Sequence, residues 1–130
     1  MIQKINHIGI IVNNLEESAE RFQSCTGLKL IRKEDLPDWK CKIAFFECGE
    51  VLIELVEPTG ESDGMTFLKE KGGGVHHICF QVDDIEKTFA ETGEKFALKN
   101  DTPKPAAGGS TAFFVEEKGM DNILIEFMAE

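Results

Sequence analysis

The chain contains an internal repeat, and each copy carries one histidine strand and one glutamate strand. The repeated elements keep their order, and the spacing between copies changes only where loops or helix ends are expected. A repeat of this length predicts two supersecondary units stacked into one domain. The matched segments are His7-Ile8-Gly9-Ile10 with His77-Ile78-Cys79-Phe80, Ile53-Glu54-Leu55 with Ile125-Glu126-Phe127, and Ala44-Phe45-Phe46 with Ala112-Phe113-Phe114.

Each half of the sequence predicts a strand, a helix and then three strands. Asn13 and Asn14 are candidate caps of the first helix and Gly27 can end it, because an amide side chain accepts from the first helical turn and glycine adopts the left-handed conformation. Asp84 to Thr92 predicts the helix of the second half. The predicted strands are His7–Val12, Leu28–Lys33, Lys42–Cys48, Val51–Glu57, Val75–Val82, Phe96–Lys99, Thr111–Glu116 and Asn122–Met128.

These elements predict an α+β fold made of two βαβββ modules within one structural domain. The modules are residues 1–60 and 74–130, and residues 61–73 form the linker between them. Gly49-Glu50 predicts a tight hairpin turn. Residues 103–109 predict a glycine-containing loop suited to closing over a ligand.

Composition excludes several classes of function. The net charge of −10 argues against nucleic-acid binding, which depends on basic side chains. No apolar run has the length of a membrane span, and the first residues lack a secretory signal pattern. The four cysteines form no CxxC pair, so we expect reduced thiols in a cytoplasmic protein.

Strand alternation places the repeated polar residues where a metal could bind. His7 shares its face with Gly9, and His77 shares its face with Cys79, so a small side chain follows each histidine. Glu54 and Glu126 each lie between two apolar residues that point to the other face. A buried carboxylate is costly unless it is paired, and metal ligation would remove that cost in both halves.

Other polar residues have simpler interpretations. His76 falls on the face opposite to His77 and has Asn6 as its counterpart, so we expect it to be a surface or supporting residue. Asp83 and Asp84 stand at a predicted helix start, where capping is the usual role of a carboxylate.

With these motifs the chain resembles the vicinal oxygen chelate superfamily, which includes glyoxalase I, methylmalonyl-CoA epimerases, extradiol dioxygenases and bleomycin-resistance proteins. The resemblance implies paired βαβββ modules whose curled mixed sheet forms a cup around a divalent metal. The family's metal ligands fall here on His7, Glu54, His77 and Glu126. Similarity to the methylmalonyl-CoA epimerases is carried by the segments at His7–Ile10, Glu54–Pro58, Gly74–Ile78, Val82–Ile85 and Ala107–Gly109.

The resemblance also implies an activity. It implies metal-dependent proton transfer alpha to a thioester, with Glu126 as both metal ligand and catalytic base, and epimerisation of methylmalonyl-CoA as the leading reaction. The alternatives are lactoylglutathione lyase (glyoxalase I), which uses the same four ligands, and a non-catalytic drug-binding protein. We expect one divalent ion (Co, Ni, Mn or Zn), an acyl-CoA or glutathione thioester as substrate, and a homodimer.

One strand departs from the epimerase pattern. Some epimerases carry a second carboxylate base where this chain has Lys40-Cys41-Lys42-Ile43-Ala44, which contains no acid. Lys42 or a water could act on the second face, Lys42 could be a surface lysine, or the substrate could differ. An anionic CoA would need basic residues near the site, and the candidates are Lys40, Lys42, Lys69, Lys71 and Lys104.

Overall fold

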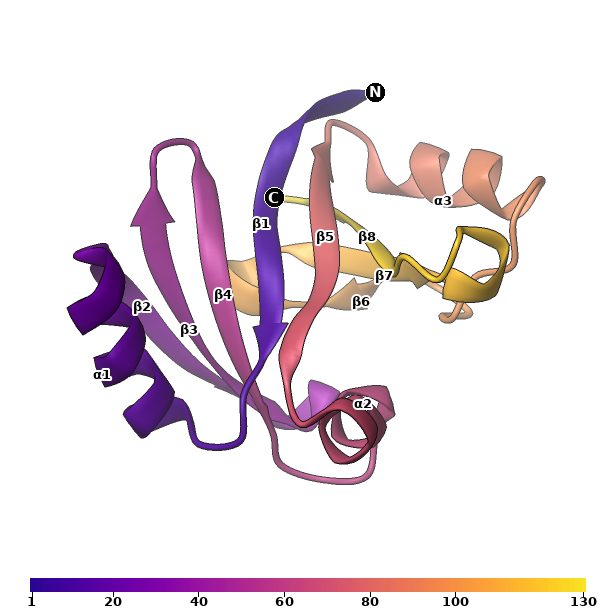
Figure 1. The fold of residues 1–130 in the computed structure, drawn as a ribbon. Helices are drawn as coiled ribbons and strands as arrows, with labels where there is room; N and C mark the ends of the chain where they lie inside the picture. Colours follow the sequence, from indigo (N-terminus) through magenta and orange to yellow (C-terminus); the bar gives the residue numbers. More distant parts are fainter. The chain divides into compact units, whose positions relative to one another are not determined.

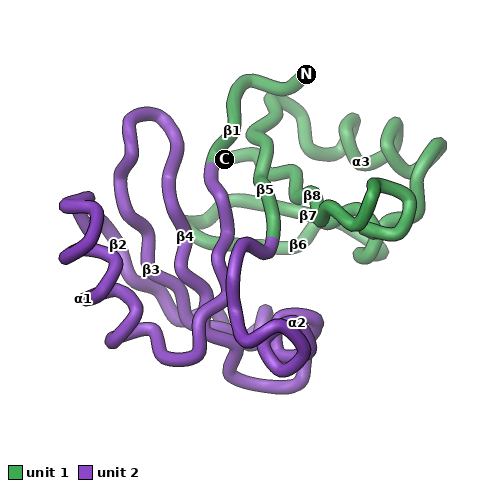
Figure 2. Tube along the Cα trace, in the orientation of Figure 1, with its two compact units in different colours: residues 1–6, 77–130 green, residues 7–76 purple.

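The structure of the chain, a computed structural model, describes all residues 1–130 and divides into two compact units (Figure 2). Unit 2 is residues 7–76, and unit 1 combines residues 1–6 with residues 77–130. The first six residues therefore fold with the second half of the chain, which the sequence did not indicate.

The sheet of unit 2 has the strand order β2-β3-β4-β1 (Figure 1). Strand β1 is parallel to β4, and the other neighbours are antiparallel. The turn at Gly49-Glu50 joins β3 to β4, as predicted. The elements are β1 (Ile2–Ile11, from His7 onward in this unit), α1 (Leu15–Thr26), β2 (Lys29–Leu36), η1 (Pro37–Trp39), β3 (Cys41–Cys48), β4 (Val51–Pro58) and α2 (Asp63–Lys71).

Helix α1 covers one face of this sheet. Its start is fixed by Asn14, whose side chain accepts a 3.0 Å hydrogen bond from the Glu17 N–H. Its end is fixed by Gly27 in the left-handed conformation, with φ of 72°. Of the two candidate caps the structure uses Asn14, and the stop at Gly27 is confirmed. Helix α1 and the sheet together build the core of unit 2. That core consists of Leu15 and Ala19 from the helix with Ala44, Phe46 and Leu55 from the sheet.

The segment predicted as a linker contains helix α2. The Ser62 hydroxyl caps its first turn by accepting from the Met65 N–H, and Gly72 ends it with φ of 78°. Gly73 then approaches the chain so closely that an added Cβ would lie 2.9 Å from the Ile11 carbonyl oxygen. Gly73 therefore lets the chain fit against the end of β1.

The sheet of unit 1 has the order β1-β5-β8-β7-β6, where β1 contributes its first residues. Strand β5 is parallel to β8, and β8, β7 and β6 are antiparallel. Phe113 is fully buried and packs its ring against Phe89 of α3 and Phe127 of β8. The elements are β5 (Gly74–Val82, from His77 onward in this unit), α3 (Ile85–Gly93), β6 (Lys104–Pro105), η2 (Ala107–Gly109), β7 (Thr111–Val115), η3 (Glu117–Gly119) and β8 (Ile125–Ala129).

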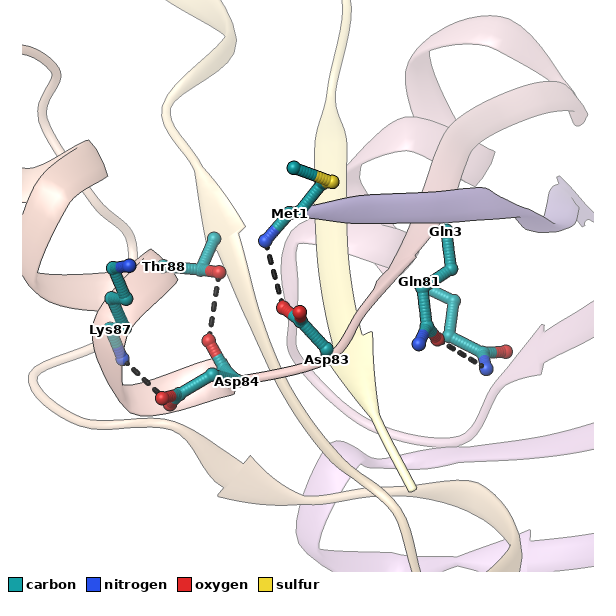
Figure 3. Close-up of polar contacts among 7 residues, drawn as sticks. All are labelled: Met1, Gln3, Gln81, Asp83, Asp84, Lys87 and Thr88. Carbon is teal, nitrogen blue, oxygen red and sulfur yellow. Dashed lines mark hydrogen bonds and ion pairs between the residues drawn. The ribbon is translucent and has the colours of Figure 1, made fainter.

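Polar contacts hold the start of β1 to the end of β5 in unit 1 (Figure 3). The Met1 ammonium donates to Asp83 at 2.8 Å, and this hydrogen bond lowers the pKa of the Asp83 carboxyl. The Gln81 side chain donates to Gln3 at 3.0 Å. Asp84 caps α3 by accepting from the Lys87 N–H at 3.1 Å, as its position predicted.

One predicted strand of the second half is wrong. Residues 96–99 form no strand and meet β7 only through a single bridge between Leu98 and Val115. The second strand of the module is instead the two-residue β6, which lies within the segment predicted as a loop. Here the side chain of Asn100 replaces a strand neighbour, because its Oδ1 accepts from the Phe114 N–H at 2.8 Å.

The fold class is confirmed as α+β with two βαβββ modules and mixed parallel and antiparallel pairing. No disulfide joins the four cysteines. None of the helices combines the length and apolar character needed to cross a membrane.

Candidate metal centre

Strand alternation in unit 2 separates the core from a polar face. Leu55 packs toward α1, so Glu54 points to the opposite face of the sheet. Glu54 lies opposite Gly9 on β1 and opposite Phe45 on β3. These residues form a row across three strands, with the carboxylate between a residue without a side chain and an aromatic ring.

His7 and Glu54 form a buried pair on this face. The His7 Nε2 lies 3.4 Å from Glu54 Oε1, and each residue is only 6% exposed. The Phe45 ring meets the imidazole edge-on, with centroids 5.6 Å apart and planes at 75°. The aromatic contact fixes the orientation of the imidazole.

Unit 1 contains an equivalent arrangement of its own histidine, glutamate and phenylalanine. His77 Nε2 lies 3.2 Å from Glu126 Oε1, and both residues are again 6% exposed. Glu126 lies opposite Cys79 and Phe114 on its neighbouring strands. The Phe114 ring meets His77 edge-on, with centroids 5.4 Å apart and planes at 83°. Each unit thus holds one imidazole, one carboxylate and one aromatic support.

The donor atoms of each pair fit neighbouring positions of a metal shell. Imidazole and carboxylate ligands bind divalent ions at about 2.0–2.2 Å, which places adjacent donors of tetrahedral or octahedral shells about 3.0–3.5 Å apart. The two separations of 3.4 and 3.2 Å lie in this range. Imidazole nitrogen with carboxylate oxygen is also a donor set that suits divalent transition metals. The chain therefore carries the components of a possible metal site.

The structure places the competing residues elsewhere. His76 is partly exposed and contacts the Phe67 ring of α2, with centroids 5.0 Å apart. Asp83 and Asp84 hold the N-terminus and the start of α3. None of these three residues contributes to the two His–Glu pairs.

The supporting phenylalanines were not predicted as site residues. The repeat alignment had matched Phe45 with Phe113, but the strand registers pair Phe45 with Glu54 and Phe114 with Glu126. Phe45 and Phe114 are therefore equivalent, and the alignment of this strand is wrong by one residue. A nine-residue connection that includes η3 separates β7 from β8, so no tight turn in the sequence fixes this register as Gly49-Glu50 does in the first half.

The structure also bears on which residue could act as a second catalytic base. Lys42 lies opposite Glu57 on β4, so it points away from the face of Glu54 and is exposed. The residues of β3 that share the Glu54 face near Phe45 are Cys41, Ile43 and Glu47; the first two are not acidic, and Glu47 is exposed. The interpretation of Lys42 as a surface lysine is favoured.

Comparison with known proteins gives a consistent result. Residues 6–114 match the model of the Glyoxalase/Bleomycin resistance protein/Dioxygenase superfamily. An ethylmalonyl-CoA/methylmalonyl-CoA epimerase of Cereibacter sphaeroides is 32% identical over 131 residues, covering 97% of each chain. A probable lactoylglutathione lyase of Vibrio cholerae is 30% identical, covering 96% of this chain and 89% of its own.

The solved structures show the same relationship. A variant methylmalonyl-CoA epimerase of Streptomyces coelicolor, in complex with 2-nitronate-propionyl-CoA, superposes with a TM-score of 0.94. It is 25% identical in sequence, and the match covers 100% of this chain and 99% of that chain.

Proposed function

We propose that this chain, which belongs to the Glyoxalase/Bleomycin resistance protein/Dioxygenase superfamily, catalyses metal-dependent proton transfer alpha to a thioester. The specific reaction that we propose is the epimerisation of methylmalonyl-CoA. The observation that carries the proposal is the pair of buried His–Glu contacts at repeat-equivalent positions. The similarity to an epimerase over nearly the whole of both chains supports the choice of reaction.

We further propose that the two pairs share one divalent ion, so that His7, Glu54, His77 and Glu126 are its ligands. In this proposal the modules form one domain whose curled sheet encloses the ion, and the remaining coordination positions accept substrate oxygens. Open positions distinguish catalytic from structural metal sites. The identity of the metal among Co, Ni, Mn and Zn is left to metal analysis.

The residues of the chain have distinct roles in this reaction. The chemistry that a bound divalent ion supplies is stabilisation of the negative charge that develops on the thioester oxygen as the proton leaves. Glu126 takes the proton from the carbon between thioester and carboxylate, working as general base. The buried strand β8 holds this carboxylate in place, and His77 and Phe114 restrict its surroundings.

The opposite face of the substrate carbon lacks an obvious protein base. Since Ile43 is apolar, Glu47 is exposed and Lys42 points away, we propose that a water molecule donates a proton on that face while the proton taken by Glu126 passes to solvent. A one-base mechanism of this kind exchanges the substrate proton with solvent, which makes isotope exchange the natural assay.

A second candidate function is lactoylglutathione lyase. The similarity to the Vibrio cholerae protein favours it, and the reaction would use the same four ligands. A non-catalytic drug-binding role is the third candidate, and the presence of all four donors argues against it.

The test is solvent-deuterium exchange at C2 of methylmalonyl-CoA, comparing metal-loaded protein with EDTA-stripped protein. We expect exchange that requires both the metal and Glu126. Glu126→Gln should slow it by about 10²–10⁴-fold, whereas Glu20→Gln, an exposed change on α1, should leave it unchanged. No exchange, together with turnover of the glutathione–methylglyoxal hemithioacetal, would replace the proposal by the lyase.

We also propose that the chain forms a homodimer in the cytoplasm. Sheet edges left unpaired are prone to association, and β2 and β6 are the edge strands of their units. Light scattering behind size-exclusion chromatography tests the dimer, and a monomeric mass across the accessible concentrations would reject it.

A further inference from the structure

An arginine shares the face of the His7–Glu54 pair in unit 2. The strand registers place Arg32 opposite Phe45, and Phe45 opposite Glu54. The row that starts at Gly9 therefore continues to the edge strand and ends in a guanidinium group. Two strand spacings, about 10 Å, separate the backbones of Arg32 and Glu54.

A β-bulge puts the arginine on this face. Leu30 lies opposite Phe46 and packs with the core under α1, so simple alternation would send Arg32 to the same side. The register shifts between Leu30 and Arg32, and Ile31 is the extra residue. Bulges often redirect a side chain next to a functional site. Here the irregularity turns a cation from the helix side to the metal-ligand side.

The Phe45 ring links the arginine to the ligand pair. The Arg32 Cζ lies 4.7 Å from the centroid of the Phe45 ring. The same ring contacts the His7 imidazole, and the two ring centroids are 5.6 Å apart. These distances place the guanidinium within about 10 Å of the His7 ring. Stacking on an aromatic face holds the planar group in one orientation without using its N–H donors.

The guanidinium keeps the capacity to bind an anion. Glu34 on the same strand approaches Arg32 Nε at 3.7 Å, which is longer than a good hydrogen bond. The Arg32 side chain remains 43% exposed. Lys29, the other basic residue that faces this side of β2, lies opposite Glu47 on β3. Arg32 is thus a stacked, accessible cation in a chain of net charge −10.

We propose that Arg32 is a specificity-determining residue that binds an anionic oxygen group, carboxylate or phosphate, on the thiol half of the substrate. The inference rests on the proposed thioester function. Its distance from Glu54 suits a group several bonds beyond the reacting carbon rather than an oxygen held by the ion. Glutathione supplies that chemistry as carboxylates and coenzyme A supplies it as phosphates.

The test is calorimetric binding of coenzyme A, glutathione and pantetheine to the metal-loaded protein, because each probe carries a thiol and pantetheine lacks the phosphates of coenzyme A. We expect Arg32→Ala to weaken binding of an anionic thiol by about 10-fold or more, because charged hydrogen bonds are lost. Pantetheine binding should not change. Arg32→Lys keeps the charge but loses the planar fork, and it should show an intermediate loss.

Lys33→Ala is the matched control. Lys33 is the next residue on β2, carries the same charge, and pairs with Glu16 of α1 at 2.8 Å on the other face. It should bind all three probes as the unchanged protein does. A loss with coenzyme A alone identifies phosphate as the group, and a loss with glutathione alone identifies carboxylate.

Three results would overturn the proposal: no preference of the unchanged protein for an anionic thiol over pantetheine, equal binding by Arg32→Ala, or equal losses in Arg32→Ala and Lys33→Ala. Both substitutions are on an exposed strand, and thermal melts confirm that each variant is folded. Because binding is measured without turnover, failure of deuterium exchange would reject the epimerase proposal and leave the anion site intact.

Discussion

Each unit brings one imidazole, one carboxylate and one aromatic ring together, but the two units differ on the side of the aromatic ring away from the carboxylate. In unit 2 the aromatic residue Phe45 is followed by strand β2, where Arg32 stacks on its ring. In unit 1 the backbone beside Phe114 is irregular. The Lys99 N–H donates to the Phe114 carbonyl, and the Asn100 side chain accepts from the Phe114 N–H. The repeated modules therefore retain the His–Glu pair with its aromatic support and diverge at the edge.

This difference indicates a division of labour between the units. Each unit contains one imidazole–carboxylate pair of closely similar geometry. The four residues are equally buried, so burial does not distinguish the two pairs. Arg32 lies in the unit that contains Glu54, and in our proposal the base is Glu126 of the other unit. Unit 2 would then bind the thiol half of the substrate while unit 1 moves the proton.

The largest expected effect separates the two glutamates. Glu126→Gln should slow deuterium exchange by about 10²–10⁴-fold even at saturating metal, because a general base is lost. Glu54→Gln should chiefly weaken metal binding and retain most exchange once metal is saturating. Exchange rates measured with metal content determined in the same samples give the comparison. Equal losses in the two variants would mean that the units share the base function.

The next effect tests the corrected equivalence of the aromatic residues. Phe113→Ala should destabilise the protein by about 3–5 kcal/mol, since a fully buried ring packed on Phe89 and Phe127 is removed. Phe114→Ala should cost less stability and weaken metal binding through His77. Urea unfolding and metal titration measure the two quantities. Greater destabilisation by Phe114→Ala would restore the original alignment of the repeat.

The histidines provide a third comparison. Loss of a residue that only supports a metal ligand lowers metal affinity by about 10–100-fold. His7→Ala and His77→Ala should each lower it by more, because they remove a proposed ligand. His76→Ala should retain its metal, because this side chain packs on Phe67 instead. Metal analysis after dialysis distinguishes the cases, and equal loss in all three would show that the strand-face assignment is wrong.

The sequence predicted those parts of the fold in which local pattern and packing agree. The caps at Asn14 and Asp84, the stop at Gly27 and the opposite faces of Glu54 and Leu55 follow from side-chain chemistry and strand period alone. Each His–Glu pair lies where the repeat placed it. That the two pairs share one ion stays a prediction.

Where neighbouring residues of a strand are all apolar, the alternation of polar and apolar residues could not fix the strand register. Ala112, Phe113 and Phe114 suit either face, and a one-residue shift reverses every side chain. Phe96–Lys99 has the composition of a strand, but Asn100 binds β7 through its side chain and prevents continuous pairing. Arg32 was missed because the bulge at Ile31 breaks the alternation on which the prediction relies.

The smallest expected effect concerns the residue before each helix cap, which is Asn13 in unit 2 and Asp83 in unit 1. The hydrogen bond from the Met1 ammonium lowers the pKa of Asp83 below its ordinary value of 3.8. A lowered carboxyl pKa adds stability that is complete above the ordinary value and is lost as the pH falls through the lowered one. The contact is solvent-exposed, so the contribution should be small.

Asp83→Asn makes unit 1 resemble unit 2 at this position. We expect the variant to be slightly less stable than the unchanged protein at pH 7, with the difference shrinking as the pH falls below 3.8. Urea midpoints across this range measure the difference, and the carboxyl carbon shift of Asp83 in NMR reports its pKa directly. Salt should reduce the effect because the two charges are exposed. A stability difference that persists undiminished at the lowest pH would assign the effect of Asp83 to hydrogen bonding that does not need its charge.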